Sequence, residues 1–143
     1  MSGYVDGVFE GGHSFVLRPL TETDLPYVLK TWTHTRPTWG KHIAKPEWDS
    51  RMARTLSWHI RDSSVEKRGL CDAEYPDWLV GFVVATWDTL DFVYVRTELR
   101  GHGLAKRLLA ALPEAPVRWA WPTREGRKLG LREVSFWHLL RYI

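Results

Sequence analysis

A short basic turn between an apolar segment and a leucine-rich segment carries the residues best suited to bind an anion. Residues 92–95 are apolar, aromatic or β-branched, which predicts a strand. The turn Arg100-Gly101-His102-Gly103 follows, and its glycines can adopt backbone angles that other residues resist. Such a turn directs the unpaired N–H groups of a new helix into one small space, and that space favours phosphate. The helix is predicted by the spacing of Leu104, Leu108, Leu109 and Leu112.

The spacing of the turn excludes two familiar phosphate sites. A dinucleotide fingerprint would need a third glycine where Lys106 stands. A P-loop would need four residues between its glycines, followed by lysine and then serine or threonine. We therefore expect a different phosphate-containing ligand, the alternative being an ordinary strand, turn and helix with a solvated basic face. The positive charges around the turn belong to Arg96, Arg100, His102, Lys106 and Arg107.

The turn and its surroundings resemble the GNAT acetyltransferase superfamily. Arg100-Gly-His-Gly-Leu-Ala105 is similar to the family's acetyl-CoA signature, Arg/Gln-x-x-Gly-x-Gly/Ala. Leu17-Arg-Pro-Leu-Thr-Glu-Thr-Asp-Leu25 is similar to its first strand and first helix, and Val80-Gly81-Phe82 is similar to its frequent Val-Gly-Phe. The resemblance, which also includes Lys128-Leu-Gly-Leu131, runs from about residue 14 to the end of the chain.

This resemblance implies one α/β domain over residues 1–143, with a mixed, largely antiparallel central sheet flanked by helices. Residues 1–13 are expected to form a loose leader. The C-terminal part is shortened, because the 13 residues after Gly130 suffice for one strand and the family usually ends with two. We therefore expect a short sheet or a homodimer in which a second subunit supplies the edge.

The residue patterns place the elements along the chain as follows. Strands are predicted at Phe15–Pro19, Val65–Ala73, Trp78–Trp87, Leu90–Arg96, Val117–Trp121 and Glu133–Ile143, and helices at residues 25–32, 47–62, 104–112 and 123–129.

The resemblance also implies the ligand and the activity, which are acetyl-CoA, no metal, and acetyl transfer to an amine. Val93 and Val95 would pair with the pantetheine arm as though it were another strand. A backbone N–H near Val95 would point at the thioester oxygen, which is the role of an oxyanion hole. The cofactor contacts implied in this way are Val93, Tyr94, Val95, Arg100, Gly101, His102, Gly103, Leu104, Ala105 and Lys106.

The residues that would move protons are less evident. Many family members carry a tyrosine just before Lys-Leu-Gly-Phe, and here Gly126 stands at that place. The substitutes are Tyr94 on the cofactor strand, Tyr142 in the last strand, and Asp91, which has the strand parity of Val93 and Val95. For the acceptor amine, the resemblance points to Trp39 and His42, in the loop between the first two helices.

Composition limits the setting of this chemistry. Cys71 is the only cysteine, so an internal disulfide and a cysteine-based zinc site are both excluded. No apolar run approaches the roughly 18 residues that span a membrane, and no secretory signal is evident. We therefore expect a cytoplasmic protein. The net charge of +3 lies in the C-terminal tail, since residues 1–112 carry equal numbers of basic and acidic groups.

Two other functions stay open from the sequence. The first is a catalytically weak GNAT-like module that binds CoA or a protein partner, for example in a phage or a small bacterial system, because the usual tyrosine is missing. The second, disfavoured, is a nucleic-acid-binding module, because aromatic and basic residues together can stack bases and neutralise phosphate. The basic and aromatic residues in question lie in the C-terminal tail and are Arg118, Trp119, Trp121, Arg124, Arg127 and Arg132.

Overall fold

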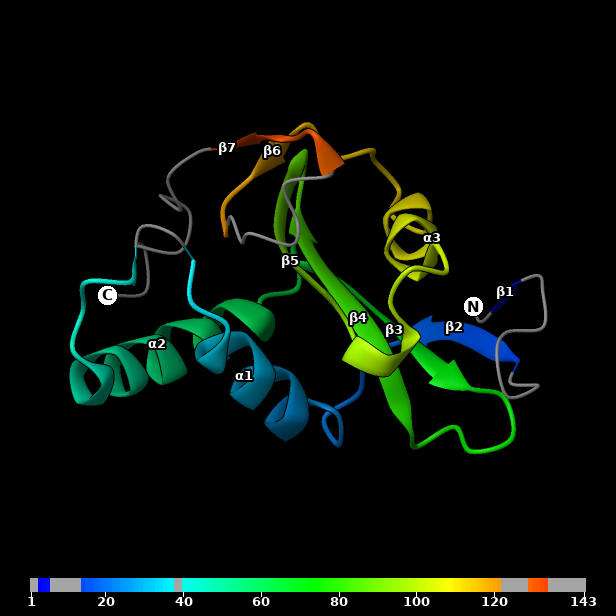
Figure 1. Ribbon diagram of the computed structural model, residues 1–143, viewed down its shortest axis with the longest axis horizontal. Helices are drawn as coiled ribbons and strands as arrows, with labels where there is room; N and C mark the ends of the chain where they lie inside the picture. Colours follow the sequence, from blue (N-terminus) through cyan, green and yellow to red (C-terminus); the bar gives the residue numbers. More distant parts are fainter. Residues whose placement is uncertain (1–2, 6–13, 38–39, 122–128, 134–143) are drawn as a thin grey trace.

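The computed structural model describes residues 3–5, 14–37, 40–121 and 129–133, and these form one mixed sheet with helices on both faces (Figure 1). The strands lie in sequence order from β1 to β7. Neighbours from β1 to β5 run antiparallel, whereas β5, β6 and β7 run parallel. The predicted fold class is therefore confirmed. The strands are β1 (Gly3–Val5), β2 (Phe15–Pro19), β3 (Glu66–Asp72), β4 (Leu79–Thr86), β5 (Thr89–Val95), β6 (Arg118–Trp119) and β7 (Arg132–Glu133).

Within the described part of the chain, three α-helices divide between the two faces of the sheet. Helices α1 (Leu25–His34) and α2 (Lys45–Ile60) cover one face, and α3 (Leu104–Ala110) covers the other (Figure 1). Each face has its own buried cluster, and β4 contributes to both because its side chains alternate. Trp32 and Trp48 are fully buried in the cluster under α1 and α2. No helix among the described residues has the length and apolarity needed to cross a bilayer.

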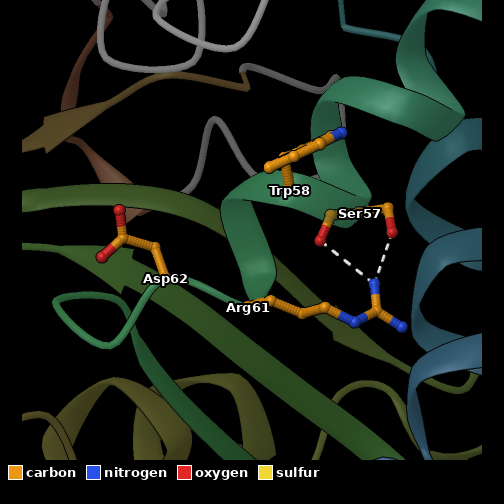
Figure 2. Close-up of a pocket in the computed structure, with 4 residues that line it drawn as sticks. All are labelled: Ser57, Trp58, Arg61 and Asp62. Atoms are coloured by element: carbon orange, nitrogen blue, oxygen red, sulfur yellow. Dashed lines mark hydrogen bonds between the residues drawn. The ribbon is translucent and has the colours of Figure 1, made fainter.

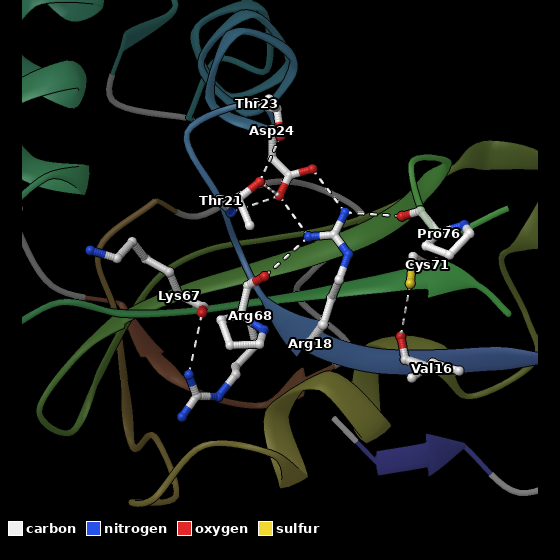
Figure 3. Close-up of polar contacts among 10 residues, drawn as sticks. Val16, Arg18, Thr21, Thr23, Asp24, Lys67, Arg68, Cys71 and Pro76 are labelled. Carbon is white, nitrogen blue, oxygen red and sulfur yellow. Dashed lines mark hydrogen bonds and ion pairs between the residues drawn. The ribbon is translucent and has the colours of Figure 1, made fainter. Parts of the chain in front are cut away.

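The entry into α1 is held by an ion pair between β2 and the first residue before the helix (Figure 3). Arg18 donates from Nη1 to Asp24 Oδ2 at 2.6 Å and from Nη2 to Asp24 Oδ1 at 2.9 Å. The Thr21 N–H also donates to Asp24 Oδ2, at 2.7 Å. Burial alone would raise the pKa of Asp24, but the hydrogen bonds from Arg18 and Thr21 outweigh it and hold that pKa below its usual value.

Gly81 permits the closest approach between three elements. A Cβ atom on Gly81 would lie 2.7 Å from the Tyr94 backbone oxygen and 3.3 Å from Leu108 Cδ1. A Cβ atom does not come within 2.7 Å of a backbone oxygen without displacing it, so β4 and β5 approach this closely, beside α3, because residue 81 is a glycine. The Val-Gly-Phe segment thus has a packing role that positions the strand and helix on either side of the basic turn.

The ends of the chain differ from the prediction in two ways. Within the expected loose leader, Gly3–Val5 forms β1 and pairs with β2. The predicted strand Val117–Trp121 is shorter, because β6 comprises Arg118 and Trp119 alone. The predicted helix over 123–129 and the last strand lie almost entirely outside the described residues, which include only Leu129 of the former and Glu133 of the latter.

Candidate active site

The candidate site begins where β6 stops pairing with β5. Among the described residues, β6 pairs with β5 only at Thr89 and Leu90. The last bond in this direction runs from the Ala120 N–H to the Leu90 carbonyl, at 2.9 Å. β5 continues to Val95, so its later residues extend past the end of β6. Such an edge carries N–H and C=O groups that can pair with an extended ligand.

The backbone of β5 presents Val93 and Val95 to this edge. On the other side, the Arg96 N–H donates to the Val80 carbonyl of β4 at 2.9 Å. In an antiparallel ladder, every second residue pair exchanges backbone hydrogen bonds, and the pairs between them do not. Counting back from Arg96, the N–H and C=O groups of residues 93 and 95 therefore face away from β4. The Val95 carbonyl accepts a hydrogen bond from Arg100 Nε at 2.9 Å, so this carbonyl points away from β4.

The basic turn follows directly and has the predicted form. A short 3₁₀ helix, η2 (Thr97–Leu99), precedes it, and α3 begins at Leu104. Gly101 and Gly103 have φ angles of 89° and 76°, in the left-handed region that favours glycine. A Cβ atom on either glycine would meet no other atom within 4 Å, so the turn faces open space. Leu104 and Leu108 anchor the helix in the core.

A group of aromatic rings and arginines lies beside the turn, between β5 and α1. Tyr94 packs against Phe82 with 5.7 Å between ring centroids, and the Arg100 guanidinium lies 5.5 Å from the centre of the Tyr94 ring. On α1, Tyr27 packs edge-on against Phe82, and Arg96 lies over the Tyr27 ring at 4.8 Å. Burial raises the pKa of Tyr27, and the Arg96 cation offsets only part of this effect. Tyr27 therefore keeps its proton at neutral pH.

Asp91 does not face the open edge, and the predicted parity is wrong at this position. The register shifts in β5, where Ala85 pairs with Leu90 and Val84 pairs with Phe92, so Asp91 is the extra residue of a β-bulge. The bulge turns Asp91 toward α2, where it is fully buried. Its Oδ2 atom lies 2.7 Å from His59 Nε2 and accepts a hydrogen bond from Thr86 Oγ1 at 2.6 Å.

His59 is the main polar residue of this region that the sequence did not reveal. It lies in the middle of an apolar helix face and 32 positions before Asp91, and no local pattern joins two residues at that distance. His59 and Thr86 are also within 3.3 Å of each other. The three side chains form a compact polar group inside the core, which we call the bulge triad.

Tryptophan side chains close the core where β5 and β6 separate. Trp32 stacks on Phe92 with 5.5 Å between centroids, and Trp121 lies edge-on to Trp32 at 5.7 Å. Trp121 Nε1 donates to the Thr35 carbonyl at 2.5 Å, which ties the end of β6 to the end of α1. Trp119 is buried on the opposite face. Neither tail tryptophan is exposed, so these two rings cannot stack on bases, as a nucleic-acid-binding tail would require.

A comparison with protein families matches residues 28–120 to the acetyltransferase (GNAT) family. This chain belongs to the GNAT family. An acetyltransferase of Trypanosoma brucei has a similar fold, with a TM-score of 0.51, 20% identity and coverage of 82% of this chain and 92% of that one. An aminoglycoside N-acetyltransferase in complex with CoA gives a TM-score of 0.49 and 16% identity over 89% of this chain and 78% of that one. A comparison with curated proteins found no match.

The remaining residues predicted for this GNAT site are only partly placed. His42 lies exposed in the connection between α1 and α2. Trp39, Tyr142 and Gly126 lie outside the described residues. No group of side chains that could hold a metal ion occurs among the residues described. A hollow of about 520 Å³ lies elsewhere, at the end of α2, and none of the predicted residues line it (Figure 2); it is formed by Ser57, Trp58, Arg61 and Asp62.

Proposed function

We propose that this protein is an acetyl-CoA-dependent N-acetyltransferase that acts on an amine. Membership of the GNAT family supports the reaction class. The observation that carries the proposal is the continuity between the edge of β5 and the basic turn. An extended arm that pairs with Val93 and Val95 would lead straight to the N–H groups of residues 101–106.

The residues of this region fit the two chemical parts of CoA. The glycines at 101 and 103 leave open space in front of the turn, which a diphosphate can enter without displacing a side chain. The outward backbone groups of Val93 and Val95 match the amides of a pantetheine arm. When bound, acetyl-CoA would supply the activated acyl group. The protein would contribute orientation and proximity, which can account for much of the rate of a reaction between two bound partners.

For proton transfer we propose Tyr94, with Tyr142 as the alternative. Tyr94 is half-buried on the cofactor strand. The Arg100 guanidinium lies 5.5 Å from the centre of its ring, and the phenol is the group of this strand that could donate a proton to a departing thiolate. Asp91 is not proposed as the base, because its carboxylate is fully buried and bonded to His59 and Thr86. Trp39 and His42 remain our proposal for the acceptor end, since they belong to the connection between α1 and α2.

Calorimetry with CoA and acetyl-CoA tests the proposal, together with thiol release over a broad panel of amines. We expect both ligands to bind and at least one amine to be acetylated. Absence of binding at millimolar acetyl-CoA would refute the cofactor assignment. Binding without thiol release for any amine would favour the catalytically weak module over the enzyme.

A further inference from the structure

The bulge in β5 decides which backbone groups face the open edge. At the start of the strand, the Leu90 carbonyl points outward and accepts a hydrogen bond from Ala120. Strict alternation from Leu90 would turn Phe92 and Tyr94 outward as well. Because Asp91 is an extra residue, the outward positions are instead Val93 and Val95.

The bulge triad holds this extra residue in place. Asp91 Oδ2 accepts a hydrogen bond from Thr86 Oγ1 of β4 at 2.6 Å and lies 2.7 Å from His59 Nε2 of α2. All three residues are at most 1% exposed. The bulge is thus fixed to the neighbouring strand and to the helix layer at once. Such a buried polar group is costly to disturb, because its members have no water to replace a lost hydrogen bond.

We propose that His59, Asp91 and Thr86 are positioning residues for acetyl transfer. This inference rests on the proposed function. By fixing the bulge, the triad directs the Val93 N–H into the gap beyond the last β5–β6 pair, where it can donate to the thioester carbonyl oxygen. None of the three side chains touches the cosubstrate. They determine which N–H group stabilises the developing oxyanion.

The proposal predicts different affinities for acetyl-CoA and for CoA, because CoA lacks the acetyl carbonyl to which the Val93 N–H would donate. The wild-type protein is expected to bind acetyl-CoA about three- to tenfold more tightly, as one hydrogen bond implies. Thr86→Val removes the hydroxyl with little change of shape. It should bring the ratio of the two dissociation constants close to one, and CoA, which has the same pantetheine arm and diphosphate but no acetyl carbonyl, should lose less affinity than acetyl-CoA.

Two variants serve as controls. Thr86→Ser keeps the hydroxyl and should keep the wild-type ratio. Thr55→Val makes the same change at another buried threonine, on α2 and outside the triad, and should also keep it. An unchanged ratio in Thr86→Val, or an equal loss of both affinities, would overturn the positioning role. If Thr86→Val does not fold, Asp91→Asn takes its place in the same comparison.

A second measurement needs no variant. In ¹⁵N-labelled wild-type protein, the Val93 amide should show the largest difference in chemical shift between the acetyl-CoA and CoA complexes. Equal shifts at Val93 in the two complexes would overturn the inference and leave the proposed function standing. Failure of the wild-type protein to bind either ligand would instead refute the proposed function, and this inference would fall with it.

Discussion

Replacing Gly103 by glutamate places a negative charge in front of the turn. Gly103 is the residue before α3, has a φ angle of 76°, and is exposed. A side chain there meets no other atom within 4 Å of its Cβ position, so the change does not clash with the protein. The substitution should lower stability, because glutamate must adopt a left-handed backbone conformation. It should also weaken ligand binding, because its negative charge repels the diphosphate. These two effects can be separated.

The backbone effect is roughly 1–2 kcal/mol of lost stability, the cost of a left-handed conformation for a residue other than glycine. The charge effect follows from Coulomb's law. Two charges about 5 Å apart in water interact by roughly 0.8 kcal/mol, so a diphosphate with about two charges is repelled by roughly 1.7 kcal/mol, or about fifteenfold in affinity. Gly103→Gln has the same shape and backbone strain and lacks the charge.

The assay is calorimetric titration with CoA at low ionic strength. We expect Gly103→Glu to bind about fifteenfold more weakly than Gly103→Gln, and added salt to reduce the difference. Gly130→Glu is the matched control, because Gly130 has a φ angle of 69° and equally open surroundings. It should lose similar stability and keep its affinity. Equal CoA affinities of the Glu and Gln variants at position 103 would show that the diphosphate does not bind at the turn.

Three further predictions concern the scaffold and the proton donor. Arg18→Met should lower the free energy of unfolding by about 2–3 kcal/mol in urea titrations, because it removes the cation from a buried carboxylate that then keeps only its hydrogen bonds from Thr21. The pKa of Asp24 is depressed in the folded state, so its contribution is present above the unfolded pKa near 4 and is lost as the pH falls through the folded pKa. The difference in Tm between wild type and Arg18→Met should therefore shrink below about pH 4, and a constant difference would contradict the ion pair. Gly81→Ala should cost about 1–3 kcal/mol through the 2.7 Å approach of its Cβ to the Tyr94 oxygen, and an unchanged Tm would contradict this packing. Tyr94→Phe should reduce kcat by roughly 10²–10⁴ and leave the CoA affinity unchanged, and full activity would exclude Tyr94 as the acid.

The elements that depend on local sequence were predictable. Helical spacing from Leu104, the glycine pair before it and the apolar run of β4 each specify a conformation through neighbours in the chain. The strand Phe15–Pro19 has the bounds predicted for it. The ends of α2 and β5 lie within two residues of their predicted positions. The basic turn was recognised for the same reason, because the features that define it lie within a few consecutive residues.

The interior of the candidate site depended on contacts between distant segments. Asp91 was predicted from alternation alone, and a bulge reversed its direction. His59 and Thr86 are joined to Asp91 only because α2, β4 and β5 pack together. Trp119 and Trp121 suggested an exposed aromatic tail, but the faces of the sheet bury both rings. The sequence by itself thus determined the basic turn and its backbone form, through local backbone preferences. The tertiary structure decided which backbone groups of β5 face the open edge, because a bulge is fixed by packing between strands and helices.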